Sequence, residues 1–173
     1  MYKIIILPLF FLVFLTSCSA DYKKLSKGSY IINNDFNQTL INEYKKNADF
    51  EALEMHDWNS AKLYSQKALR SFNGELIKPE SISSWDIGQD NKSELIKAYD
   101  NLIAVYNDGL NNDPINLAVA IVSLDCWGEQ QEEGWQIEHI ERCKSNFLDS
   151  MHSLYDNLHK ENISNIMKQK NFK

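Results

Sequence analysis

The chain has few residues that interrupt helices, since its 173 residues include only 3 Pro and 6 Gly. This composition permits long helices. A basic stripe of the kind that binds nucleic acid is lacking, and the formal net charge is −6. The charge balance therefore argues against a nucleic-acid partner. The most apolar stretch after the N-terminus, residues 115–124, is shorter than the roughly 20 residues that span a bilayer, so it predicts a buried helix.

Motifs that carry catalysis are missing as well. No serine lies in a Gly-x-Ser-x-Gly elbow, and no glycine-rich phosphate loop is present. The sequence therefore favours a protein that is not an enzyme, and we expect no cofactor and no metal site.

The N-terminus carries a processing signal. A lysine precedes an apolar run over residues 4–15, and the run ends in Leu15-Thr16-Ser17-Cys18. An apolar run of about twelve residues is typical of a signal peptide and too short for a spanning helix. The order Leu-Thr-Ser-Cys matches a bacterial lipobox. We therefore expect residues 1–17 to be removed and Cys18 to carry acyl chains such as palmitate, which anchor the chain to a membrane.

The residues after the lipobox indicate where the anchored chain lies. Ser19 follows Cys18, whereas an Asp there would resemble an inner-membrane retention signal, so we expect the periplasmic face of the outer membrane. Residues 18–35 are polar and contain Gly28. They are predicted to form a flexible tether.

Residues 36–168 are expected to form one helical domain, followed by a short tail over 169–173. Apolar residues repeat there at spacings of three and four, with little period-two alternation. The pattern predicts an all-α bundle of about five helices. Asp57 is expected to cap the second helix, which ends at Gly74, and Asp113 followed by Pro114 to start the fourth, over 114–132.

Three further features belong to this prediction. An ordered loop is expected over 75–91, with Trp85 and Ile87 holding it to the core. The predicted inward face of the second helix consists of Trp58, Ala61, Ser65, Ala68 and Phe72, and that of the fifth consists of Ile137, Ile140, Cys143, Phe147, Met151, Leu154 and Leu158.

The second predicted helix resembles part of a known repeat. Asp57 and Trp58, followed by Ala61 and Ala68, are similar to the second half of a tetratricopeptide repeat. No convincing second copy occurs at a spacing of about 34 residues. The segment is therefore either one degenerate repeat or a generic helical hairpin.

Two cysteines remain after Cys18. Cys126 lies eight residues before Gly134 and Cys143 nine after it. In an antiparallel helical hairpin these positions have nearly the same height, about 12–14 Å from the turn at 1.5 Å per residue. A disulfide is thus possible, and an oxidising periplasm favours it. Two free thiols, or a zinc site that also uses His139, are the alternatives.

A polar cluster at the end of the fourth helix is the predicted partner surface. It consists of Glu129, Gln130, Glu132, Glu133 and Trp135. With Asp125, these carboxylates could form a solvated acidic face, a contact for a cation or a basic protein, or an acid/base pair. Trp127 and Trp135 flank the cluster, and each could pack in the core or act as a binding hot spot.

Several segments together carry a family resemblance. They are Phe50-Glu51-Ala52-Leu53-Glu54-Met55-His56-Asp57-Trp58, Lys67-Ala68-Leu69, and Asp125-Cys126-Trp127-Gly128-Glu129-Gln130-Gln131-Glu132-Glu133-Gly134-Trp135-Gln136 with Cys143. They resemble the helical N-terminal region of certain OmpA-family outer-membrane lipoproteins, over residues 40–155. The resemblance implies an envelope lipoprotein.

In that family a peptidoglycan-binding domain usually follows the helical region, and its segment has no counterpart in these 173 residues. The resemblance therefore does not extend to direct peptidoglycan binding. The expected function is a non-enzymatic module that binds another envelope protein. The alternative is a structural spacer without a defined partner.

Overall fold

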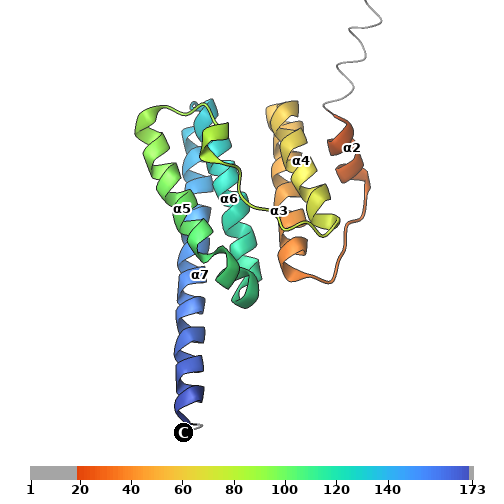
Figure 1. Cartoon of the computed structure of the whole chain (residues 1–173). Coiled ribbons are helices and arrows are strands. Elements are labelled where there is room, and N and C mark those ends of the chain that lie inside the picture. Colours follow the sequence, from red (N-terminus) through yellow and green to blue (C-terminus); the bar gives the residue numbers. More distant parts are fainter. Residues whose placement is uncertain (1–18, 172–173) are drawn as a thin grey trace, which may run out of the picture. The chain divides into compact units, whose positions relative to one another are not determined.

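A computed structural model describes residues 19–171, with side chains through Ser164, and every regular element in that range is helical (Figure 1). The elements are α2 (Ala20–Lys27), α3 (Asp35–Phe50), the π-helical turn η1 (Glu51–Met55), α4 (Trp58–Phe72), the 3₁₀ turn η2 (Ile82–Ser84), α5 (Gln89–Asn112), α6 (Pro114–Glu133) and α7 (Ile137–Asn171). The predicted all-α class is confirmed. The predicted signal peptide, Cys18 and residues 172–173 of the tail lie outside the described residues.

The chain forms two compact units, where the sequence predicted a single helical domain over 36–168. Among the described residues, the first unit contains residues 19–33 and 40–77, and the second contains residues 34–39 and 78–171. Helical periodicity identifies the buried face of each helix but not the helix that covers it. The division into two units was therefore not visible in the sequence.

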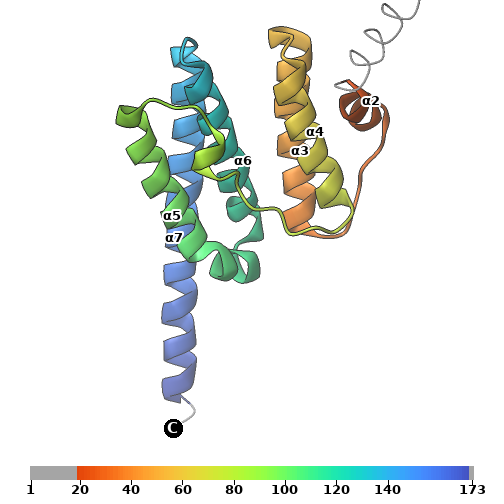
Figure 2. The same cartoon turned by 45° about the horizontal axis from the view of Figure 1, so that its top comes forward.

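The first unit begins with α2, so the predicted flexible tether over 18–35 is wrong for Ala20–Lys27. Tyr22 and Leu25 are buried on one side of this helix, and α2 lies beside α4 (Figure 2). The spacing of three between Tyr22 and Leu25 places both on one helical face. Packing of that face holds an otherwise polar segment in place.

The helices α3 and α4 are joined by a tight turn. The chain passes through η1 to His56, which adopts the left-handed conformation at φ 58°. The Asp57 carboxylate then caps α4, because its Oδ1 accepts hydrogen bonds from the backbone N–H of Asn59 at 2.7 Å and of Ser60 at 3.1 Å. The predicted cap is confirmed.

The core of the first unit contains two stacked tyrosines. The rings of Tyr44 in α3 and Tyr64 in α4 have their centroids 6.1 Å apart. Ala61, Ser65 and Ala68 are buried as predicted, whereas Trp58 and Phe72 at the two ends of α4 are exposed. The predicted inward face of this helix is therefore correct at its centre and wrong at its ends.

The second unit packs α5, α6 and α7 against one another. Asp113 caps α6 by accepting the N–H of Asn116 at 3.2 Å, and Pro114 takes the first helical position. Most of α6 is buried, as expected of a helix that is apolar nearly all round. On α7 the predicted face is buried at Ile140, Cys143, Phe147, Met151, Leu154 and Leu158, while Ile137 is exposed.

The connection from residue 78 to α5 is an ordered segment with the η2 turn. Trp85 and Ile87 are buried in it, so the predicted anchoring of this loop is confirmed. The C-terminal part of α7 continues past α5 and α6 (Figure 1). Residues 159–163 of α7 are exposed.

Candidate interaction surface at the α6–α7 hairpin

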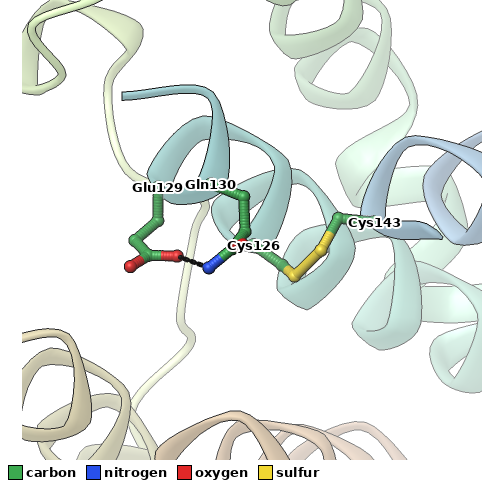
Figure 3. Close-up of a disulfide and its surroundings, with 4 residues drawn as sticks. All are labelled: Cys126, Glu129, Gln130 and Cys143. Atoms are coloured by element: carbon green, nitrogen blue, oxygen red, sulfur yellow. Dashed lines mark hydrogen bonds between the residues drawn. A yellow bond between two sulfur atoms is a disulfide. The ribbon is translucent and has the colours of Figure 1, made fainter. Parts of the chain in front are cut away.

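The hairpin of α6 and α7 brings the two predicted cysteines together. The sulfur atoms of Cys126 and Cys143 lie at disulfide distance, and the two Cα atoms are 5.6 Å apart (Figure 3). Cys143 is buried and Cys126 is half-buried. A disulfide leaves neither sulfur as a thiolate, so the zinc alternative with His139 would require the reduced form.

The predicted partner surface is wrong for Glu129 and Gln130. These residues are 2% and 1% exposed, respectively, and the Gln130 Nε2 donates a hydrogen bond to the Glu129 carboxylate at 2.7 Å (Figure 3). Four successive residues, Trp127 to Gln130, are buried. Since four residues cover a full helical turn, this turn of α6 has no side left for a partner.

Two other carboxylates of the cluster hold the loop that precedes α5. The Asp125 Oδ1 accepts the backbone N–H of Glu80 at 2.6 Å, and the Glu132 Oε1 accepts the backbone N–H of Asp86 at 2.6 Å. Asp125 and Glu132 are seven residues apart, so they lie on one face of α6. We call this arrangement the loop latch.

Gly128 lies between the two latch carboxylates and allows the loop to approach. A Cβ at this position would lie 2.6 Å from the Nε1 of Trp85. The indole of Trp85 therefore packs where only glycine leaves room. The sequence contained a signal for this arrangement, because positions 125, 128 and 132 share a helical face. The signal was missed because nothing in the sequence indicated that the loop would cover that face.

The two tryptophans of the hairpin have different environments. Trp127 is buried against Phe147, with ring centroids 6.0 Å apart, and the Lys144 Nζ lies 5.3 Å from the Trp127 centroid. Trp135 is 67% exposed. Of the two alternatives left open by the sequence, Trp127 is a core residue, and Trp135 is free to act as a contact residue.

The turn that carries Trp135 has a defined backbone. Gly134 ends α6 in the left-handed conformation at φ 72°, and its N–H bonds to the Gln130 carbonyl. The Gln136 carbonyl then accepts the N–H of Ile140 at 3.0 Å, and the Gln136 side chain donates to the Glu133 carboxylate at 3.1 Å. Hydrogen bonds thus fix the backbone on both sides of the turn, at the end of α6 and at the start of α7.

Two large apolar side chains project from this turn, Trp135 and Ile137, and the latter is 63% exposed. Two carboxylates are next to them in the sequence: Glu133 is half-buried and Glu138 is exposed. We call the four residues Glu133, Trp135, Ile137 and Glu138 the hairpin tip. It keeps Glu133 and Trp135 of the predicted surface and adds two residues of α7.

A second feature of the unit is a shallow polar groove of about 250 Å³ between α6 and α7, lined by Asn116, Val119, Asn146, Asp149, Ser150 and Ser153. Its hydroxyls donate within their own helix, from Ser150 to the Asn146 carbonyl at 2.7 Å and from Ser153 to the Asp149 carbonyl at 3.0 Å. The groove therefore presents few uncommitted donors to a ligand.

Comparisons of the chain with protein-family models, with curated proteins and with solved structures found no match. Within residues 19–171, none of the helices combines the length and the apolar character that crossing a bilayer requires.

Proposed function

We propose that the chain is a lipid-anchored protein of the bacterial envelope that binds another envelope protein through the hairpin tip and catalyses no reaction. The lipobox ending at Cys18 supports the anchor, and the residue after it, Ser19, supports the periplasmic face of the outer membrane. The resemblance of residues 40–155 to the helical region of OmpA-family lipoproteins supports the same location.

The exposure of Trp135 and Ile137 on an ordered turn is the observation that carries the interaction part of the proposal. Exposed aromatic side chains held in one conformation are typical centres of protein–protein interfaces. A rigid turn has little conformational freedom to lose on binding, which lowers the cost of association. The disulfide between Cys126 and Cys143 links α6 and α7, the two helices that the turn connects.

The charges around the tip indicate the kind of partner. Glu133 and Glu138 lie beside the apolar pair, and Glu132, the residue before Glu133, is exposed. Complementary charge increases the rate of association and excludes partners of like charge. We therefore expect the partner to present an apolar pocket with basic residues at its rim.

A structural spacer is the second candidate function. The length of α7 favours it, because 35 helical residues extend about 52 Å at 1.5 Å per residue. A spacer needs the anchor and the helix but no apolar contact at the tip. Substitution of Trp135 therefore distinguishes the two functions.

The test is photo-cross-linking in cells with a photoreactive amino acid in place of Glu138. This position is exposed and leaves Trp135 and Ile137 in place. We expect one recurrent envelope protein to be captured. In the same chain, Trp135→Ala should weaken capture strongly, since truncation of a hot-spot residue costs about 2 kcal/mol or more, which is roughly a 30-fold change in Kd.

The matched control is Ile115→Ala. Ile115 is also an exposed apolar residue of the second unit, and it lies at the opposite end of α6 from the tip. Its truncation should leave capture unchanged. Capture of random abundant proteins, equal in the Trp135→Ala and Ile115→Ala chains, would contradict the interaction function and favour the spacer.

A further inference from the structure

The first described helix begins immediately after the proposed lipid attachment site. Only Ser19 separates Cys18 from α2, which starts at Ala20. This helix packs against α4 within the first unit. Leu25 is fully buried, the Asp21 carboxylate accepts a hydrogen bond from Gln66 of α4 at 2.8 Å, and the ring of Tyr22 meets that of Trp58 edge-on with centroids 6.0 Å apart.

These contacts limit how far the first unit can be from the lipid. Cys18 precedes Tyr22 by four residues, and a chain spans at most about 3.6 Å per residue, so the two Cα atoms are within about 14 Å. Trp58 contacts Tyr22 directly. The turn between α3 and α4, which ends at Trp58, therefore lies close to any acyl chain carried by Cys18.

Two large apolar side chains are exposed at that turn. Leu53 of η1 is 63% exposed, and Trp58 is 41% exposed. They flank His56, whose left-handed backbone reverses the chain between them. Tryptophan favours the boundary between water and lipid, because its ring is apolar while its N–H can still bond to water or headgroups.

The same unit also carries positive charge on its first helix. Lys23, Lys24 and Lys27 are exposed on α2, on positions other than the buried face of Tyr22 and Leu25. Lysines close to a membrane are attracted by anionic phospholipid headgroups. A phospholipid surface therefore fits all three features, which are the apolar pair, the lysines and the short connection to Cys18.

We propose that Leu53, Trp58 and the exposed lysines of α2 form a membrane-docking surface that rests on the headgroups of the bilayer anchoring Cys18. This inference rests on the proposed lipid anchor, because only the anchor brings the surface to a bilayer. It deepens that proposal, since the first unit then lies on the membrane instead of hanging from a flexible tether. The ligand class is an anionic phospholipid surface.

The experiment uses the full mature lipoprotein in vesicles of phosphatidylethanolamine and phosphatidylglycerol, part of which carries bromine on the acyl chains. Bromine quenches the fluorescence of tryptophans that reach the acyl boundary. The chain has 4 Trp, so wild-type emission should fall by up to about a quarter. Trp58→Phe, which keeps an aromatic ring against Tyr22, should abolish the quenching. The control Trp135→Phe should retain it.

A second variant tests the surface without removing the probe. Leu53→Ser should reduce the quenching of Trp58, because it removes the other exposed apolar side chain of the proposed surface. Quenching that is the same in the Trp58→Phe chain as in the wild type would overturn the docking surface.

Flotation of the vesicles separates the two proposals. A chain that floats with the vesicles but shows no quenching keeps its anchor and contradicts the docking surface. A chain that does not float contradicts the anchor, and the docking surface is overturned with it.

Discussion

The backbone N–H of Glu80 donates a hydrogen bond to the Asp125 carboxylate at 2.6 Å, across 45 positions of the sequence. This bond connects the loop that precedes α5 to the middle of α6. Asp125 is buried, so its charge is compensated inside the second unit instead of being presented to a partner. Asp125, which the sequence placed in a possible acidic face, therefore stabilises the fold.

Removal of this carboxylate should loosen the loop. In Asp125→Ala the N–H of Glu80 loses a charged acceptor, and bonds of this kind contribute about 1.5–3 kcal/mol. We expect the free energy of unfolding to fall by about 2 kcal/mol and the amide of Glu80 to exchange faster with solvent. Urea unfolding and hydrogen exchange measured by NMR check the two effects. Asp100→Ala, at an exposed carboxylate of α5, is the control, and an unchanged Glu80 exchange rate would contradict the latch.

Gly128→Ala should disturb the same loop from the opposite side. The new Cβ would lie 2.6 Å from the Trp85 Nε1, so the indole must move, and overpacking of this kind costs about 1–3 kcal/mol. Near-ultraviolet circular dichroism should report the displaced Trp85. Gly88→Ala is the matched control, because no heavy atom lies within 4 Å of its added Cβ. Equal effects of the two substitutions would rule out the close contact.

The cysteine pair should stabilise the hairpin. The two residues are separated by 17 positions, and closing a loop of this size contributes roughly 3 kcal/mol in the chain-entropy model. Cys126→Ser or treatment with a reductant should lower the melting temperature of the second unit, and the effects should not add. Protein taken directly from cells should resist alkylation until it is reduced. Full alkylation of both thiols before reduction would show that the bond does not form in the cell.

The pKa of Tyr22 reports the docking of α2. Burial raises this pKa above its ordinary value of 10.0, and the neighbouring Asp49 raises it further through its charge and a hydrogen bond. The folded chain thus holds the phenol proton more tightly than the unfolded chain. The stabilisation is complete below pH 10 and is lost as the pH rises through the folded pKa.

Asp49→Asn should lower the pKa of Tyr22 while leaving the burial contribution. NMR titration of ring-labelled tyrosine measures the shift, and Glu43→Gln, at another carboxylate of α3, should leave it unchanged. A Tyr22 pKa at its ordinary value in the wild type would mean that α2 is not docked.

The elements that the sequence predicted well are those with a local cause. Asp113 and Pro114 start α6, Gly134 ends it, and the spacing of Cys126 and Cys143 about that glycine anticipated their meeting. Each of these depends on a few neighbouring residues and on helical geometry alone.

The elements that the sequence missed depend on packing between distant segments. Only two residues of the eight-residue helix α2, Tyr22 and Leu25, are buried, and two positions are too short a pattern to distinguish a helix from a tether. Glu129 and Gln130 are polar, yet they lie on a buried turn of α6. Whether a polar residue is covered depends on which segments pack over its helix, and periodicity does not contain that information.

The state of Cys18 tests the central claim most directly, because the compartment, the anchor and the membrane-docking surface all depend on it. Cells would be grown with a clickable palmitate analogue, and the intact mass of the detergent-extracted protein would be measured for the wild type and for Cys18→Ser. The account predicts a chain that begins at Cys18 and carries labelled acyl chains, and loss of the label in the variant. A wild-type chain that retains residues 1–17 or lacks acyl chains would contradict the account.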